Sequence, residues 1–261
     1  MNIKKLIDGI KDEYKSKSLL VRIIYLILSI LVVVCLVREI IFGDNKNIMI
    51  CIVVLVLFLI PSIIHSMFKI SFSSYLEVMI YILIFSSEIL GEVFGFYIHI
   101  KMFDTMLHIL YGFVMSCIGF SLINILNSNR NIFSFAPKVI LLFTICYGVT
   151  TGAIWEIFEY SVDKIFKEDM QKDTIITEIS SIKLNDNDDN KVKTVEIESL
   201  IVNGNDYIEK YGGYVDIGLN DTMKDIIINL IGTILFSLFA GAYLEGKGDF
   251  VSNFILSEEI R

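Results

Sequence analysis

The stretch LLVRIIYLILSILVVVCLVREIIF, residues 19–42, decides the fold class of this 261-residue chain. It is apolar almost throughout, and its length is what an α-helix needs to cross about 30 Å of hydrocarbon. A chain inside hydrocarbon has to satisfy its own backbone hydrogen bonds, which a helix does within one segment. The stretch therefore predicts a transmembrane helix.

Other apolar blocks of similar length follow it along the chain. They predict further spans at residues 48–68, 73–96, 104–126, 137–160 and 221–244, with a kink at Pro61 and with Pro137 as a first helical residue. The chain is 54% hydrophobic and its mean hydropathy is +0.66, whereas soluble domains are about 45–50% apolar. The sequence predicts an all-α, polytopic membrane helix bundle of about six transmembrane helices. Small residues at helical spacing, Gly91 with Gly95 and Gly148 with Gly152, would let its helices approach closely.

The segments outside the spans indicate how the chain is oriented. Residues 1–18 carry apolar residues at helical spacing with lysines between them, which predicts a cytoplasmic amphipathic helix on the membrane surface. Lysine and arginine favour the cytoplasmic side of span ends. With both termini inside, that side carries Lys4, Lys5, Lys11, Lys15, Lys17, Arg22, Lys69, Arg130, Lys138, Lys247 and Arg261, and the other side only Arg38, Lys46 and Lys101. We therefore expect the N-terminus and the cytoplasmic tail, residues 245–261, on the same side.

The polar segment 161–220 is then an extracytoplasmic insert. Residues 174–184 and 192–202 alternate like strands around a run of turn formers at 185–190, which favours a β-hairpin over a loosely structured loop. The net charge of -8 argues against nucleic acid as a partner. The four cysteines (Cys35, Cys51, Cys117 and Cys146) lie in apolar blocks without paired spacing, so we interpret them as packing residues.

Four spans carry polar side chains three or four residues apart, near one end of each helix. These sets are Glu88 with Glu92, Asp104 with His108, Glu156 with Glu159, and Asp221 with Asp225 and Asn229. Such spacings share one helix face. Because alternate spans run in opposite directions, all four ends meet at the predicted outer surface. Helical rise makes Glu92, Asp104, Glu159 and Asp221 a rim and puts Glu88, His108, Glu156 and Asp225 about one turn deeper, with Asn229 deeper still.

Structural explanations compete with a functional one at the rim. Asp104 and Asp221 can cap helices, and Glu159 can be a solvated residue at the interface. Glu39 and Glu77 lie near span ends, from which we expect them to reach the interface. Capping does not explain His108, Glu156 and Asp225, and ionisable residues within a span usually face a polar interior. For these three, the sequence favours a shared polar site over unrelated interhelical hydrogen bonds.

The order of these motifs resembles that of known families. The pattern D-x-x-x-H-x-x-x-G (Asp104, His108, Gly112), then W-E-x-x-E, then D-x-x-x-D-x-x-x-N-x-x-G (Asp221, Asp225, Asn229, Gly232) resembles the YjdF-like family of bacterial membrane proteins. It is more distantly similar to VanZ-like proteins, from which it departs at Glu159, where glutamine is usual. The resemblance covers residues 104–232 and implies a bacterial cytoplasmic membrane, but no established activity.

The sequence leaves three functions open. The first is an outward-facing Asp/Glu/His site for Mg²⁺, Mn²⁺ or Zn²⁺ that binds or processes a lipid or envelope-precursor ligand. Its metal ligands would be Asp104, His108, Glu156 and Asp225, with Glu156 and Asp225 also as catalytic candidates and Glu88, Glu159, Asp221 and Asn229 as substrate-binding candidates. Close carboxylates repel one another, so a cation or shared protons are expected.

The two alternatives use the same residues differently. In a structural or partner-binding protein the polar cluster is interhelical glue and the insert is the contact surface. In a cation or proton transporter, Glu88, Glu156 and Asp225 carry the ion, although a relay normally continues across the membrane and the inner halves of these spans are almost wholly apolar. The sequence has no P-loop, G-x-S-x-G or H-E-x-x-H motif. It does not decide whether the protein is an enzyme.

Overall fold

A computed structural model of the chain describes residues 3–128, 135–185 and 190–258. Arg130, Arg261 and positions 186–189 of the predicted turn lie outside these residues. The chain forms two compact units, which are Met1–Gly152 with Ile228–Arg261, and Ala153–Ile227. Two helices, α8 (Pro137–Phe166) and α10 (Leu219–Leu244), belong to both units because each continues without a break through the boundary.

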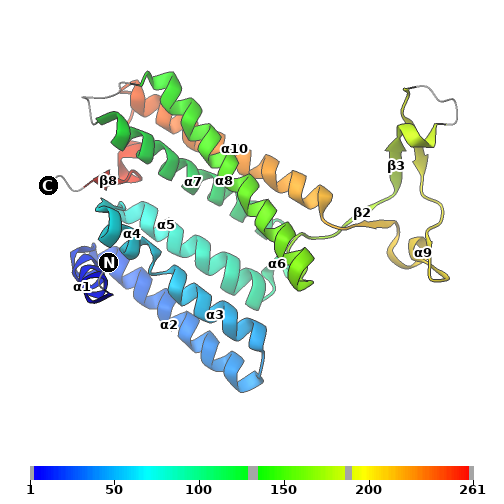
Figure 1. Ribbon diagram of the computed structural model, residues 1–261, viewed down its shortest axis with the longest axis horizontal. Coiled ribbons are helices and arrows are strands. Elements are labelled where there is room, and N and C mark those ends of the chain that lie inside the picture. Colours follow the sequence, from blue (N-terminus) through cyan, green and yellow to red (C-terminus); the bar gives the residue numbers. More distant parts are fainter. Residues whose placement is uncertain (1–2, 129–134, 186–189, 259–261) are drawn as a thin grey trace. The chain divides into compact units, whose positions relative to one another are not determined.

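The first unit is helical (Figure 1). Besides its parts of α8 and α10, its helices are α1 (Ile3–Ser16), α2 (Leu19–Phe42), α3 (Asn45–Leu57), α4 (Ile60–Phe68), α5 (Ser74–Ile84), the π-helix η1 (Phe85–Val93), α6 (Phe96–His99) and α7 (Phe103–Ser128). The Ser18 hydroxyl caps α2 by accepting the Val21 N–H, and Gly43 ends it in the left-handed region at φ 78°. Local sequence thus sets where this span begins and ends.

Five of the six predicted spans are confirmed. Within the described residues, five helices are long and apolar enough to cross a membrane, namely 19–42, 45–68, 103–127, 137–166 and 219–244. The kink predicted at Pro61 is a break between α3 and α4, just before the proline. The predicted span 73–96 is an α-helix that changes into a π-helix at Phe85. The chain is therefore an all-α membrane helix bundle.

Two apolar cores hold the first unit together. One core joins α2, α3 and α5 around Val32, Cys51, Phe58 and Tyr81, which are almost fully buried. The other lies around Val114, Phe120 and Phe236 of α7 and α10. Burial of Cys35, Cys51 and Cys117 agrees with their interpretation as packing residues, whereas Cys146 is exposed.

The end of the chain closes onto this second core. After α10 come the short helix η3 (Phe250–Asn253) and strand β8 (Ser257–Glu258), which pairs antiparallel with β1 (Ile70–Ser71). The Leu256 N–H donates a hydrogen bond to the Ser121 hydroxyl of α7 over 2.9 Å. The C-terminal segment is thereby fixed against α7.

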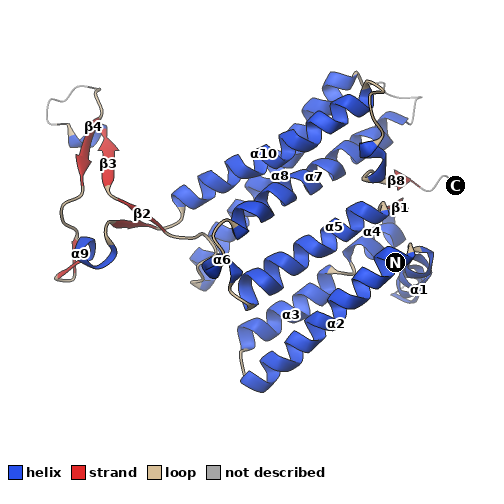
Figure 2. Ribbon diagram, turned by 180° about the vertical axis from the view of Figure 1, so that it is seen from behind, coloured by secondary structure: helices blue, strands red, loops and turns tan. Residues whose placement is uncertain are grey.

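The second unit holds the insert between α8 and α10 (Figure 2). Its hairpin pairs β3 (Glu178–Ser181) with β4 (Lys193–Glu196), which confirms the predicted β-hairpin over a loosely structured loop. In addition β2 (Thr174–Ile176) pairs with β7 (Tyr214–Asp216), and β5 (Ile201–Val202) with β6 (Asn205–Asp206). Short helices η2 (Ile182–Leu184) and α9 (Tyr207–Tyr211) complete it. The insert is shorter than predicted, because α8 continues to Phe166 and α10 begins at Leu219.

We expected Glu39 and Glu77 to reach the interface, but both side chains lie against other parts of the protein. They are only 4% and 3% exposed. Glu39 accepts hydrogen bonds from Arg38 over 2.7 Å and from Asn47 over 3.3 Å. Glu77 pairs with Lys17 and accepts the Tyr81 hydroxyl over 2.5 Å. Hydrogen bonds and charged partners let these carboxylates remain inside the bundle.

Candidate functional site

Asp104 and His108 form a pair at the start of α7. They lie one turn apart on one face, and His108 Nε2 is 3.4 Å from Asp104 Oδ1. The imidazole is buried, while Asp104 is partly open. A carboxylate beside one ring nitrogen fixes the tautomer of a neutral imidazole, or stabilises its charged form. The pair can therefore orient a histidine that binds a ligand.

Further along α7, just after His108, glycines bring the backbones of α7, α8 and α10 close together. A β-carbon at Gly232 would overlap the Ile109 carbonyl oxygen of α7, and one at Gly152 would overlap the side chain of Asn229. The Thr233 hydroxyl donates to the Gly112 carbonyl over 3.4 Å. The close approach predicted for Gly148 and Gly152 is confirmed by these contacts of α8 with α10.

We refer to this close approach of α7, α8 and α10 as the glycine junction. Asn229 lies at its centre and is 1% exposed. Its Nδ2 donates to the Gly148 carbonyl over 3.0 Å. Among the described residues its Oδ1 has no hydrogen-bond partner. The contacts of Asn229 join helices, so within the first unit they are those of a packing residue.

Glu156 and Asp225 belong to the second unit and are 4% and 2% exposed. Lys224 Nζ is 3.5 Å from Asp225 Oδ1 and 3.7 Å from Asp221 Oδ1. Along their unbroken helices, Glu156 follows Gly152 by about one turn and Asp225 precedes Asn229 by about one turn.

Asp221 has a different role from the cap we considered. Its Oδ2 accepts the backbone N–H of Lys172 over 2.7 Å, and the neighbouring Thr222 hydroxyl is hydrogen-bonded to Gln171. The N-terminus of α10 is instead served by Asp216, which accepts the Asn220 N–H over 2.8 Å. Asp221 therefore fastens the strand side of the insert to α10.

Two aspartates that the sequence analysis missed shape the insert. Asp163 accepts the N–H groups of Met170 and Gln171 over 2.7 Å and 2.9 Å, so it closes the turn after α8. Asp216, two residues before Gly218, had a usable signal, since an Asp before a helical apolar run is a common N-terminal cap. Partial burial, followed by the charges of Asp169, Asp216 and Asp163, raises the pKa of the Asp173 carboxyl.

The remaining candidates make contacts on their own or a neighbouring helix. Glu159 accepts the Trp155 indole N–H over 2.8 Å. Glu88 accepts the Ser87 hydroxyl over 3.5 Å, and Glu92 Oε2 is 3.9 Å from Lys46 Nζ of α3. Glu88 and Glu92 lie on the π-helix, a conformation often found at functional sites. No sequence pattern predicted that conformation.

Within the units, the structure brings together Asp104 with His108, and Asp221 with Asp225 through Lys224. Residues 23–246 match the family model described as a predicted membrane protein, DUF2238. No curated protein and no solved structure matches the chain.

Proposed function

The chain belongs to the DUF2238 family of predicted membrane proteins, and we propose that it binds a divalent cation at its Asp/Glu/His site. The ligands would be Asp104, His108, Glu156 and Asp225. The cation would hold the phosphate of a lipid or envelope-precursor head group in a bacterial cytoplasmic membrane, at the extracytoplasmic ends of the spans. The resemblance of the three motifs to YjdF-like proteins supports the bacterial membrane.

The Asp104–His108 pair is the observation that carries the proposal. A carboxylate oxygen and a buried imidazole nitrogen that lie 3.4 Å apart are close enough to bind one cation together. Asp225 and Glu156 add buried carboxylates on α10 and α8. One imidazole with carboxylate oxygens suits Mn²⁺ or Zn²⁺, and Mg²⁺ with more retained water.

The chemistry follows from the charge of such an ion. A divalent cation offsets the repulsion between carboxylates, and it polarises a phosphate or carbonyl oxygen of the bound head group. If the head group reacts, Glu156 is the candidate general base and Asp225 a ligand or second base. Glu88, Glu159, Asp221 and Asn229 would contact the remainder of the substrate.

One observation favours a second function, the structural role. The contacts of Asn229 with the glycines of α7 and α8 are those of interhelical glue. In that case His108, Glu156 and Asp225 would also serve only to join helices. The two functions differ in whether an ion binds.

Metal analysis of the purified protein tests the proposal. Wild type is compared with His108→Ala, Glu156→Gln and Asp225→Asn, and with Glu198→Gln, an exposed carboxylate of the insert, as the matched control. We expect bound metal in wild type and in the control, and at least about tenfold weaker binding in each site variant. An added ion at about 100 times its dissociation constant should stabilise the fold by about 2.7 kcal/mol, seen as a higher Tm.

Circular dichroism and gel filtration establish that each variant is folded. Folded variants that have lost the metal support the site. Wild type that carries no metal and shows no shift of Tm with Mg²⁺, Mn²⁺ or Zn²⁺ refutes it and leaves the structural role.

A further inference from the structure

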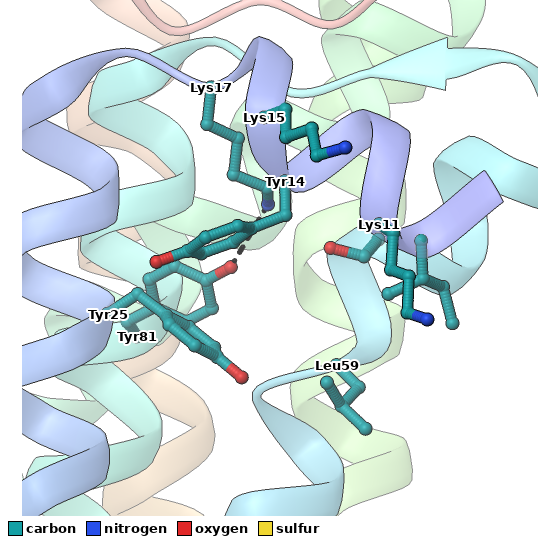
Figure 3. A pocket seen from close by; sticks show the side chains of 9 residues that line it. Lys11, Tyr14, Lys15, Lys17, Tyr25, Leu59 and Tyr81 are labelled. Atoms are coloured by element: carbon teal, nitrogen blue, oxygen red, sulfur yellow. Dashed lines mark hydrogen bonds between the residues drawn. The ribbon is translucent and has the colours of Figure 1, made fainter. Parts of the chain in front are cut away.

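A cavity lies in the first unit, between α1 and the ends of the helices that it covers. It has a volume of about 360 Å³. Its walls come from α1, α2, α5 and the break before α4, and the residues that line it are Ile10, Lys11, Tyr14, Lys15, Lys17, Tyr25, Leu59, Ser62 and Tyr81 (Figure 3). This volume is in the range of small-molecule pockets.

Lys17 at the base of this cavity is already paired. Its Nζ is 3.0 Å from Glu13, pairs with Glu77 and is 3.3 Å from the Tyr81 hydroxyl, as the dashed line in Figure 3 marks. Glu13 also accepts the Ser62 hydroxyl over 2.5 Å. These bonds fasten α1 to α4 and α5, so Lys17 contributes structure rather than free positive charge.

The other two lysines have no such partner. Lys11 and Lys15 lie one turn apart on α1, and both are exposed. Neither makes an ion pair or hydrogen bond within the part of the chain that the structure describes. The Tyr14 and Tyr25 rings pack edge to face at 5.7 Å, and their hydroxyls likewise make no hydrogen bond to described residues. Two cations and two hydroxyl donors therefore line the cavity without an acceptor among the described residues.

The depth of the cavity relative to the spans identifies the kind of ligand. It lies where α2 begins at Leu19, α4 ends at Phe68 and α5 begins at Ser74, the level at which apolar helices meet lipid head groups. The helix that covers it is amphipathic and rich in lysine, as are helices that lie in the head-group layer. Ile10, Leu59 and the tyrosine rings give the cavity an apolar wall beside its lysines.

We propose that this cavity is a binding site for the phosphate-bearing head group of an anionic phospholipid. The ammonium groups of Lys11 and Lys15 bind the phosphate oxygens, and the hydroxyls of Tyr14 and Tyr25 donate hydrogen bonds to the head group. The apolar wall takes the first carbons of the acyl chains. The site uses none of the residues of the proposed cation site.

Native mass spectrometry of lipid retention tests this site. The full chain is exchanged into mixed micelles with equal amounts of phosphatidylglycerol and phosphatidylcholine, and wild type is compared with Lys11→Ala/Lys15→Ala. The control, Lys138→Ala/Lys247→Ala, removes two exposed lysines outside the cavity. Each lysine near an anionic head group contributes about fivefold to binding, so we expect roughly 30-fold weaker phosphatidylglycerol retention in the first pair alone.

Two further arms separate this cavity from a merely basic surface. Tyr14→Phe keeps the ring and removes one hydroxyl, and it should weaken phosphatidylglycerol retention about threefold to tenfold while Tm stays unchanged. Inorganic phosphate at millimolar concentration should not displace the lipid. Equal retention of both lipids by wild type, equal loss in both lysine pairs, or displacement by inorganic phosphate overturns the proposal.

Discussion

Two regions of the first unit bury polar side chains in opposite ways. At the junction of α7, α8 and α10, one amide, Asn229, bonds to a backbone carbonyl between helices that approach through glycines. Where α1 covers α4 and α5, charged side chains join the helices. There Lys17 pairs with Glu13 and Glu77 and donates a hydrogen bond to the Tyr81 hydroxyl. The first region is the glycine junction, and we refer to the second as the lysine cluster.

The difference teaches where stability resides in each region. In the glycine junction the side chain contributes little, and the close fit of backbones contributes most. In the lysine cluster the helices meet through a charge that has to be matched, so one substitution leaves ions unpaired in a buried setting. The two regions should therefore respond in opposite ways to changes of shape and of charge.

The largest expected effect is that of Lys17→Met, which breaks the lysine cluster. The change leaves the buried carboxylates of Glu13 and Glu77 without their cation, at a cost of about 3–5 kcal/mol. Thermal unfolding in an uncharged detergent, followed by circular dichroism, should show a strongly lowered Tm. Lys15→Met, two residues earlier on α1 and exposed, is the control and should leave Tm unchanged.

A double variant establishes that charge rather than packing is responsible. Lys17→Met/Glu77→Gln removes one orphaned carboxylate, and it should recover part of the lost stability. A double variant that is less stable than Lys17→Met would contradict the account of the lysine cluster as a charge-matched contact.

The next effect is a change of shape at the glycine junction. In Gly232→Ala the new methyl group overlaps the Ile109 carbonyl oxygen, a backbone atom that cannot rotate away, and we expect a loss of about 1–3 kcal/mol. Gly241→Ala on the same helix is the matched control, because its β-carbon would be 3.6 Å from Leu141 Cδ1, an ordinary contact. The control should be neutral or slightly stabilised, since alanine favours a helix. Equal Tm values for the two variants would contradict the close approach of α10 to α7.

The glycine junction and the lysine cluster differ in how far the sequence alone could predict their contacts. The glycine junction was foreseen in outline, because Gly148 and Gly152 are spaced by one helix turn, and such spacing is a local signal. Asp104 and His108 were likewise paired correctly from their spacing alone, and the structure confirms their contact. Helix positions followed from apolar runs, since a membrane span has to be long and continuous.

The lysine cluster could not be foreseen, because its members come from distant parts of the chain. Nothing local to Glu77 says that Lys17, 60 residues earlier, will neutralise it. For that reason Glu77 was expected at the interface, whereas it is buried against Lys17 and Tyr81. The π-helix at Glu88 and Glu92 also had no signal, because the same apolar sequence is compatible with an α-helix. Capping was one of two explanations considered for Asp221, but its partner, the Lys172 N–H, lies in the insert 49 residues away.

The smallest effect expected is that of Asn229→Ala, which tests whether the amide matters apart from the glycines. The change removes the bond to the Gly148 carbonyl, and interhelical hydrogen bonds in membranes contribute about 0.6 kcal/mol on average. With the small space left by the side chain, we expect a loss of about 1 kcal/mol, well below that of Lys17→Met. Asn253→Ala, an exposed asparagine, is the control.

Metal analysis of the Asn229→Ala variant then separates the two proposed roles of the polar residues. Metal retained by the less stable Asn229→Ala protein assigns Asn229 to the glycine junction alone, whereas metal lost from a folded protein assigns it to the cation site as well.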